Sequence, residues 1–203
     1  MKIVLPGDEI LDRPIHMENT FVENNKTYTA VLAMLHDDKL IPLEGLWYPK
    51  VGDKVVGRVE EDKFSIYEID LNGPYSGLLI SKFVKSPLLV GDIIEATVKE
   101  IDRYNTIILY KSRKLYGGKL ISVKPSKIPR IIGRNNTMLK QLIEGTKCNI
   151  SVGANGYIWI KGNNIHLAIK AITKIAKEAH TGGLTNRISD MLGVKNGETT
   201  TNS

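Results

Sequence analysis

Residues 1–50 alternate short apolar runs with turn residues, a pattern typical of small antiparallel strands. Two runs, at 20–23 and 27–32, flank a turn at 24–26, whose asparagines can adopt the positive φ of a tight hairpin. A further short strand is expected at 39–43. Strands of this length bury little apolar surface alone, so we expect this unit to pack on another part of the chain or on another protein.

Residues 51–115 contain one sequence motif twice, and this repetition predicts a small β-barrel. Val-Gly-Asp occurs at 51–53 and at 90–92, and each copy precedes a β-branched run, over 54–59 and 93–98. Further short strands are expected at 64–69, 77–80 and 106–110. Several short strands in a segment of this length are typical of a closed barrel such as the OB fold, which does not by itself identify a ligand.

Residues 116–190 change to a mixed pattern of strands and helices. A helix is expected at 138–143, and a longer one at 165–179, where apolar residues recur at the spacing of one helix face. Strands are expected at 119–123, 149–152 and 157–160. The fold class is therefore mainly β with an α+β part, and the polar residues 191–203 predict a disordered tail.

The composition is that of an ordinary globular protein, with 42% hydrophobic and 25% charged residues among 203. It excludes a collagen-like fibre, a coiled-coil rod and a mostly disordered chain. No apolar run reaches the ~18 residues of a membrane span, and the N-terminus becomes acidic too early for a signal peptide. The single cysteine, Cys148, excludes an internal disulfide and a cysteine-based zinc site, so we expect a cytoplasmic protein without membrane contact.

Charge is distributed unevenly along the chain, whose formal net charge is +6. Residues 1–50 hold 5 basic and 8 acidic residues, a net charge of −3, and residues 51–115 hold 10 of each. Residues 116–203 hold 13 basic and 4 acidic residues, a net charge of +9. A basic end of this kind indicates either a polyanionic partner or an ordinary solvated basic face, and charge alone does not separate the two.

Signals for catalysis are poor. The histidines are scattered without metal-ligand spacing, and the motifs HExxH, GxSxG and GxxxxGK[ST] do not occur. The acidic residues at 37–38 and 60–62 fit solvated turns better than metal ligands. We therefore expect no catalytic residue, no metal and no cofactor in this chain.

The segment 131–136, Ile-Ile-Gly-Arg-Asn-Asn, resembles a phosphate-binding arrangement, because a glycine-started loop enters a helix there. Backbone N–H groups at a helix N-terminus and the helix dipole both favour an anion. Between 119 and 147 only Glu144 opposes the cations Lys119, Lys124, Lys127, Arg130, Arg134, Lys140 and Lys147. Such a patch predicts salt-dependent affinity for nucleic acid.

These segments resemble two RNA-binding modules. The segment 131–134 lies where a KH domain has its GXXG loop, which clamps about four nucleotides. The segments 51–59, 64–70 and 77–79 resemble an S1 domain, an OB-fold RNA binder. Exposed aromatic residues of S1-like domains stack bases at about 1–3 kcal/mol each. Tyr67 is the candidate, with Phe64 and Tyr75 behind it, although Phe64 is equally well interpreted as a core residue.

The whole chain resembles the archaeal exosome RNA-binding cap subunit with S1 and KH domains. Leu-Pro-Gly-Asp at 5–8 resembles the start of those subunits, Asn-Gly-Pro-Tyr at 72–75 their S1 loop, and 153–159 their GxNG signature segment. The resemblance implies an N-terminal β domain at 1–50, an S1 barrel at 51–115 and a KH domain at 116–190.

The resemblance also implies partners. Such subunits form a trimer with neighbouring cap subunits on a hexameric ring of RNase PH-like subunits, gripped through the N-terminal domain. They capture single-stranded RNA and feed it through the pore, where other subunits degrade it from 3′ to 5′. The chain itself would then be non-catalytic. The alternatives are a free-standing S1/KH factor in transcription or translation, and a nuclease, which no carboxylate cluster supports.

Candidate RNA-binding residues follow from charge, loop placement and these resemblances. They are Lys63, Phe64, Tyr67, Tyr75, Lys82, Arg103, Arg113, Lys127, Arg130, Arg134 and Asn135. Arg103 precedes the turn at 104–105, where OB-fold loops meet nucleic acid, but pairing with neighbouring acids remains an equal alternative.

Two loops differ from loops that would contact RNA directly. Asn136 replaces the last glycine of an RNA-clamping KH loop, and its side chain hinders close backbone approach. The loop with Gly153, Asn155 and Gly156 is either an RNA contact or, as we favour, a tight turn packed against the S1 domain.

Overall fold

The computed structural model describes residues 2–36, 39–43, 45–103, 106–179 and 181–194. The expected turn at 37–38 and the tail beyond 194 lie outside these residues. The chain divides into two compact units, one of Met1–Tyr48 with Lys124–Ser126 and one of Pro49–Val123 with Lys127–Ser203. No helix of the described residues is long and apolar enough to cross a membrane.

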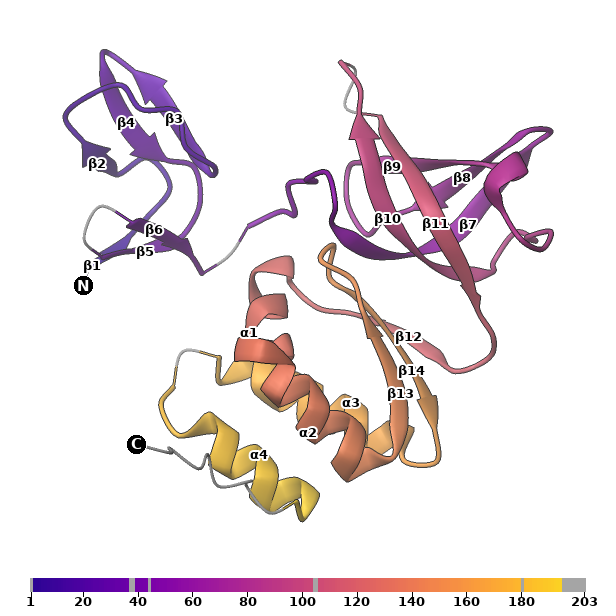
Figure 1. Ribbon diagram of the computed structural model, residues 1–203. Coiled ribbons are helices and arrows are strands. Elements are labelled where there is room, and N and C mark those ends of the chain that lie inside the picture. The colour runs from indigo at the N-terminus through magenta and orange to yellow at the C-terminus, as the bar shows by residue number, and fades with distance from the viewer. Residues whose placement is uncertain (1, 37–38, 44, 104–105, 180, 195–203) are drawn as a thin grey trace, which may run out of the picture. The chain divides into compact units, whose positions relative to one another are not determined.

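The first unit consists of two small antiparallel sheets (Figure 1). One has the order β1-β5-β6, with β1 (Lys2–Val4), β5 (Ala33–His36) and β6 (Lys39–Pro42). The other has the order β2-β4-β3, with β2 (Glu9–Leu11), β4 (Lys26–Thr29) and β3 (Thr20–Glu23). The predicted hairpin is confirmed, since Asn24 and Asn25 have φ of 47° and 65°. The core of the first unit is small, with Val4, Ile10 and Ala33 buried.

A closed five-stranded barrel begins the second unit, as predicted. Its order is β10-β11-β9-β8-β7. The strands are β7 (Lys54–Lys63), β8 (Ile66–Asp70), β9 (Ser76–Ile80), β10 (Ile93–Ile101) and β11 (Ile107–Leu115). The strands alternate between buried and partly exposed residues, as a barrel wall requires. The parallel pairing of β9 with β11 closes the barrel.

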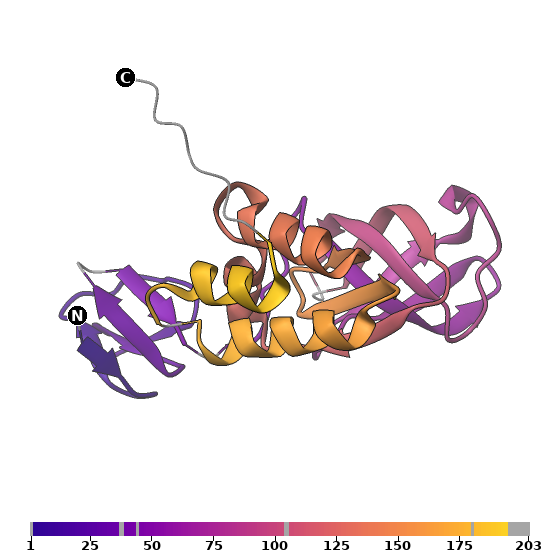
Figure 2. The same ribbon diagram turned by 90° about the horizontal axis from the view of Figure 1, so that it is seen from below.

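The α+β part is a three-stranded antiparallel sheet with helices on one face (Figure 1, Figure 2). Its order is β12-β14-β13, with β12 (Lys119–Ser122), β14 (Tyr157–Gly162) and β13 (Cys148–Val152). The helices are α1 (Ile128–Ile132), α2 (Thr137–Thr146), α3 (Ile165–Lys177) and α4 (Leu184–Leu192). The predicted fold class, mainly β with an α+β part, is therefore confirmed.

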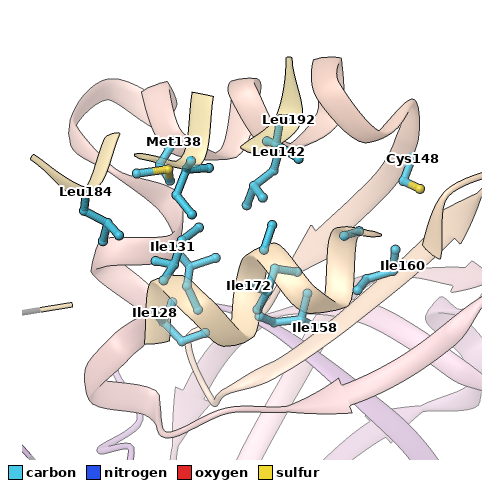
Figure 3. Close-up of a cluster of buried hydrophobic side chains, with 14 residues drawn as sticks. Ile128, Ile131, Met138, Leu142, Cys148, Ile158, Ile160, Ile172, Leu184 and Leu192 are labelled. Carbon is cyan, nitrogen blue, oxygen red and sulfur yellow. The ribbon is translucent and has the colours of Figure 1, made fainter. Parts of the chain in front are cut away.

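The two faces of β14 bury different partners. Ile158 and Ile160 point to the helices and join the core that includes Leu142 and Ile172 (Figure 3). Trp159 points to the opposite face, where it packs with Val56 and Leu115 of the barrel. Because side chains of a strand alternate, one strand therefore links the helical core to the barrel.

Helices α1 and α4 were not anticipated. Pro129 lies in the first turn of α1, where a proline fits because the N–H of that position has no partner in the helix. In α4, Leu184, Ile188 and Leu192 are buried at a spacing of four residues. The predicted tail therefore begins too early, because α4 continues to Leu192.

Candidate nucleic-acid interface

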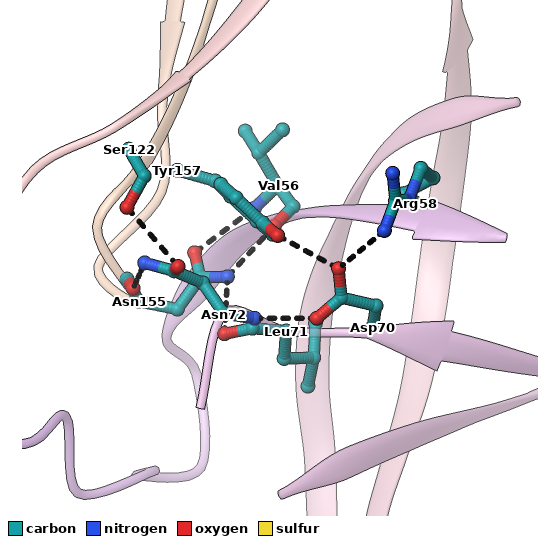
Figure 4. A network of polar contacts seen from close by, with 8 residues as sticks. All are labelled: Val56, Arg58, Asp70, Leu71, Asn72, Ser122, Asn155 and Tyr157. Carbon is teal, nitrogen blue, oxygen red and sulfur yellow. Dashed lines mark hydrogen bonds and ion pairs between the residues drawn. The ribbon is translucent and has the colours of Figure 1, made fainter. Parts of the chain in front are cut away.

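Asn155 joins the barrel to the α+β part through its side-chain amide (Figure 4). The residue is fully buried. Its Nδ2 donates to the backbone carbonyls of Val56 at 2.7 Å and Leu71 at 2.9 Å, and its Oδ1 accepts from the Val56 N–H at 3.3 Å. The polar groups of this amide are thus occupied within the protein and are not available to a nucleobase.

The turn that carries Asn155 admits no larger residue at its start. A Cβ on Gly153 would lie 2.2 Å from the Asn155 Oδ1 and 2.5 Å from the Val56 nitrogen. From the barrel side, the Asn72 Nδ2 donates to the Asn155 carbonyl at 3.0 Å. Gly156 has a φ of 91°, which favours glycine. The structure thus brings together the signature-loop residues and Asn72.

A second bridge lies beside the first and was not anticipated from the sequence (Figure 4). The Tyr157 hydroxyl donates to Asp70 Oδ2 at 2.7 Å, and Arg58 lies 3.5 Å from the same oxygen. Burial, and then the hydrogen bond to Asp70, raise the pKa of Tyr157 to about 12. The hydroxyl therefore remains protonated at neutral pH and keeps donating. The only local signal was a tyrosine next to the signature turn.

The loop that resembles GXXG is built from three positive φ angles. Gly133, Asn135 and Asn136 have φ of 73°, 53° and 62°. A Cβ on Gly133 would lie 2.8 Å from the Met138 nitrogen and Cβ, so glycine is needed there. Arg134 and Asn135 are exposed just before α2. This end of α2 therefore presents a cation and backbone N–H groups to solvent.

The two cations before this loop differ in exposure. Lys127 is half-buried, whereas Arg130 is exposed and donates to the Thr181 carbonyl at 3.4 Å. The contact directs the Arg130 guanidinium toward the segment that precedes α4.

Tyr67 is not the exposed stacking platform that we expected. Its side chain is 7% exposed, and its hydroxyl accepts a hydrogen bond from the Leu88 N–H at 3.3 Å. The apolar residues of this segment fit both phases of alternation, 64 and 66 or 67 and 69, so the pattern could not decide which face is inside. The strand places Tyr67 and Ile69 inside the barrel.

Phe64, in contrast to Tyr67, is exposed. It lies in the turn between β7 and β8 with a φ of 50°, and its side chain is 103% exposed. The interpretation of Phe64 as a core residue is therefore wrong. Tyr75 lies half-buried in the loop between β8 and β9.

A second exposed aromatic residue, Phe83, lies near Phe64 and was missed. It is 59% exposed and belongs to the 3₁₀ helix Ser81–Phe83. The Ser81 N–H donates to the Ser65 carbonyl at 3.0 Å, which brings the two turns to the same end of the barrel. An aromatic residue beside Lys82 in a polar loop was the available signal.

The predicted barrel cations differ in their pairing. Lys63 lies 2.6 Å from Glu68 and 3.0 Å from Glu61, and the hydrogen bond to Glu68 raises its pKa. Arg113 lies 3.3 Å from Glu95. Lys82 and Arg103 are exposed and have no carboxylate partner among the described residues. The turn at 104–105, which was expected to meet nucleic acid, lies outside the described part of the chain.

Within the part of the chain that the structure describes, no three His, Cys, Asp or Glu side chains lie close enough together to hold a metal ion.

The fold and the contact through Asn155 define a class of protein in which a closed five-stranded β-barrel is packed against a KH domain. The family model described as "KH domain" matches residues 118–166. The chain is also similar to a crystal structure of a protein that is described as an exosome complex RNA-binding protein. The TM-score is 0.67 and the sequence identity is 32%, over 73% of this chain and 96% of that one.

The comparison with curated proteins identifies the family. The chain is 37% identical to "Exosome complex component Rrp4" of Pyrococcus abyssi over 94% of this chain and 82% of the relative. It is 34% identical to the protein of the same name from Methanothermus fervidus, over 94% of each chain. The chain belongs to the Rrp4 family of exosome complex components.

Proposed function

We propose that this protein is the non-catalytic RNA-binding cap component of an archaeal exosome. It captures single-stranded RNA and feeds it through the pore to RNase PH-like subunits, which degrade it from 3′ to 5′. The observation that carries the proposal is the similarity to Rrp4 proteins along 94% of the chain. A barrel and a KH domain joined through Asn155 support it, because both folds are RNA-binding modules.

The distribution of charge supports different roles for the two ends of the chain. The C-terminal residues 116–203 carry a net charge of +9, which favours capture of a polyanion by counterion release. The N-terminal residues 1–50 carry a net charge of −3 and form a unit with a small core, which fits docking on the hexameric ring. Neighbouring cap subunits complete a trimer on that ring, in the cytoplasm.

The RNA contacts of the proposal are exposed residues of the barrel turns and of the KH loop. They are Phe64, Lys82, Arg103, Arg134 and Asn135. Lys63, Tyr75, Arg113, Lys127 and Arg130 are secondary candidates, since each is paired, half-buried or hydrogen-bonded.

The test is RNA degradation by a purified RNase PH-like hexamer, with and without this protein, across a series of salt concentrations. We expect faster and more processive decay with the protein present, and we expect the effect to fade as salt rises. No change in decay, together with no co-migration of the protein and the hexamer, would overturn the proposal and favour a free-standing RNA-binding factor. RNA cleavage by the pure protein would overturn the non-catalytic assignment.

A further inference from the structure

Two adjoining cavities lie along the last part of β11 and the KH sheet. One, of about 420 Å³, extends from Lys85 to Tyr116 along the barrel. The other, of about 440 Å³, extends from Arg113 to Lys161 of the KH sheet. Both are lined by Arg113, Lys114 and Tyr116, and we call the two cavities together the β11 groove.

The β11 groove is basic. Its cations are Lys85, Lys111, Arg113, Lys114 and Lys161. Two carboxylates oppose them: Asp92 lies 2.5 Å from Lys114, and Glu95 lies 3.3 Å from Arg113. Among the described residues, Lys85, Lys111 and Lys161 have no carboxylate partner, so three cations remain for a ligand.

Lys111 lies in a bulge of β11 and lines the first cavity, and its ammonium lies 5.2 Å from the centre of the Tyr110 ring. Opposite β10, Arg113 pairs with Glu95 and Tyr110 pairs with Thr97, so that two residues of β11 face one of β10. Lys111 lies in this bulge with a φ of 50°. Bulges of this kind change the direction of a side chain, and they occur often at binding sites.

The exposed aromatic residue of the groove is Tyr116. Tyr116 is 61% exposed and precedes Gly117 and Gly118, whose φ angles are 65° and 77°. Trp159 Nε1 donates to the Gly117 carbonyl at 2.7 Å, which ties this turn to the KH sheet. The Lys114 ammonium lies 5.3 Å from the centre of the Tyr116 ring. The ring is therefore exposed and lies next to a turn that is tied to the KH sheet.

We propose that the β11 groove binds single-stranded RNA, with a base stacked on Tyr116 and phosphates on Lys111 and Lys161. A basic channel with an exposed aromatic ring is the arrangement that binds single strands without sequence preference. The groove lies at the opposite end of β11 from Arg103, because β11 runs from Ile107 to Leu115. The inference rests on the proposed function and adds an RNA path from the barrel to the KH sheet.

The test measures binding of a fluorescein-labelled 12-nucleotide oligouridylate by fluorescence anisotropy across a salt series. The variant is Lys111→Ala with Lys161→Ala, and the matched control is Lys170→Ala with Lys177→Ala, two exposed lysines of α3. We expect the groove variant to lower the slope of log K against log salt by about 1.4, since each phosphate contact on a single strand contributes about 0.7. The control should retain the wild-type slope. An equal loss in both variants would overturn the proposal, because it would show a general charge effect.

Tyr116 supplies the second arm. Tyr116→Ala should weaken binding by about 5-fold or more, whereas Tyr116→Phe keeps the stacking ring and should bind as wild type does. Groove variants that bind RNA normally would overturn the groove while leaving the cap function standing. A wild-type protein that does not bind the oligonucleotide would overturn both. If the wild-type protein bound an acidic peptide but not RNA, and the groove variant lost the peptide, the groove would be assigned to a protein partner instead.

Discussion

The side-chain amide of Asn155 donates to the backbone carbonyl of Val56 at 2.7 Å, across 99 positions of sequence. This bond connects the first barrel strand to the turn of the KH sheet. A barrel and a KH domain in tandem could each move freely on a linker, but here both lie in one compact unit. The surfaces of the two modules therefore lie in a fixed relation to each other.

Replacing Asn155 with alanine should destabilise the protein by about 3 kcal/mol, because several buried backbone groups lose their partners. The change removes the acceptor for the Val56 N–H and the donor to the carbonyls of Val56 and Leu71. The measurement is the free energy of unfolding from a urea titration. Asn149→Ala is the control, since Asn149 is an exposed residue of β13, the strand that precedes the turn of Asn155. Equal stability of the two variants would contradict the structural role of Asn155.

Gly153→Ala should cost about 1–3 kcal/mol through overpacking. The added Cβ would meet the Asn155 Oδ1 at 2.2 Å and the Val56 backbone at 2.5 Å, and a backbone atom cannot move aside as a flexible side chain can. Gly182→Ala is a matched control, because a Cβ there meets nothing within 4 Å. Denaturant unfolding of the two variants measures the difference, and a tolerated Gly153→Ala would show that the turn has room.

Phe64 and Tyr67 should respond in opposite ways to alanine. Tyr67→Ala opens a cavity in the barrel and should lower stability by about 3–5 kcal/mol. Phe64→Ala removes a fully exposed ring and should change stability by less than about 0.5 kcal/mol. If Phe64 stacks on RNA, its removal should still weaken oligouridylate binding by about 5-fold or more. Unfolding titrations and anisotropy separate these effects, and unaltered RNA binding by Phe64→Ala would exclude it from the RNA path.

The sequence predicts those features that depend on local periodicity. The helix α3 follows from apolar residues on one face, and the barrel strands follow from β-branched runs after Gly-Asp turns. Tyr67 was misassigned because apolar residues around it fit both phases of alternation. The hydrogen bonds of Tyr157 to Asp70 and of Asn155 to Leu71 join residues 87 and 84 positions apart, and no local pattern records them. The β11 groove likewise depends on the fold, which places Lys85 and Lys111 in one cavity and Tyr116 and Lys161 in the other.

Tyr157 should make stability fall at alkaline pH. Its pKa rises from the ordinary 10.0 to about 12, mainly through burial and then through its hydrogen bond to Asp70. The folded protein thus holds this proton more tightly than the unfolded chain does. Its contribution to stability is complete below pH 10 and is lost as the pH rises from 10 towards 12.

The measurement of this effect is the urea midpoint of the wild type and of Tyr157→Phe between pH 8 and about 11.5, a range that enters the window between the two pKa values. At pH 8 the wild type should be more stable, since Tyr157→Phe leaves Asp70 without its hydroxyl donor. The difference should narrow as the pH approaches the upper limit, because the unfolded chain loses the tyrosine proton first. Tyr116→Phe removes an exposed hydroxyl and controls for tyrosine replacement in general. A difference between the wild type and Tyr157→Phe that stays constant over this range would contradict the raised pKa and the bridge that causes it.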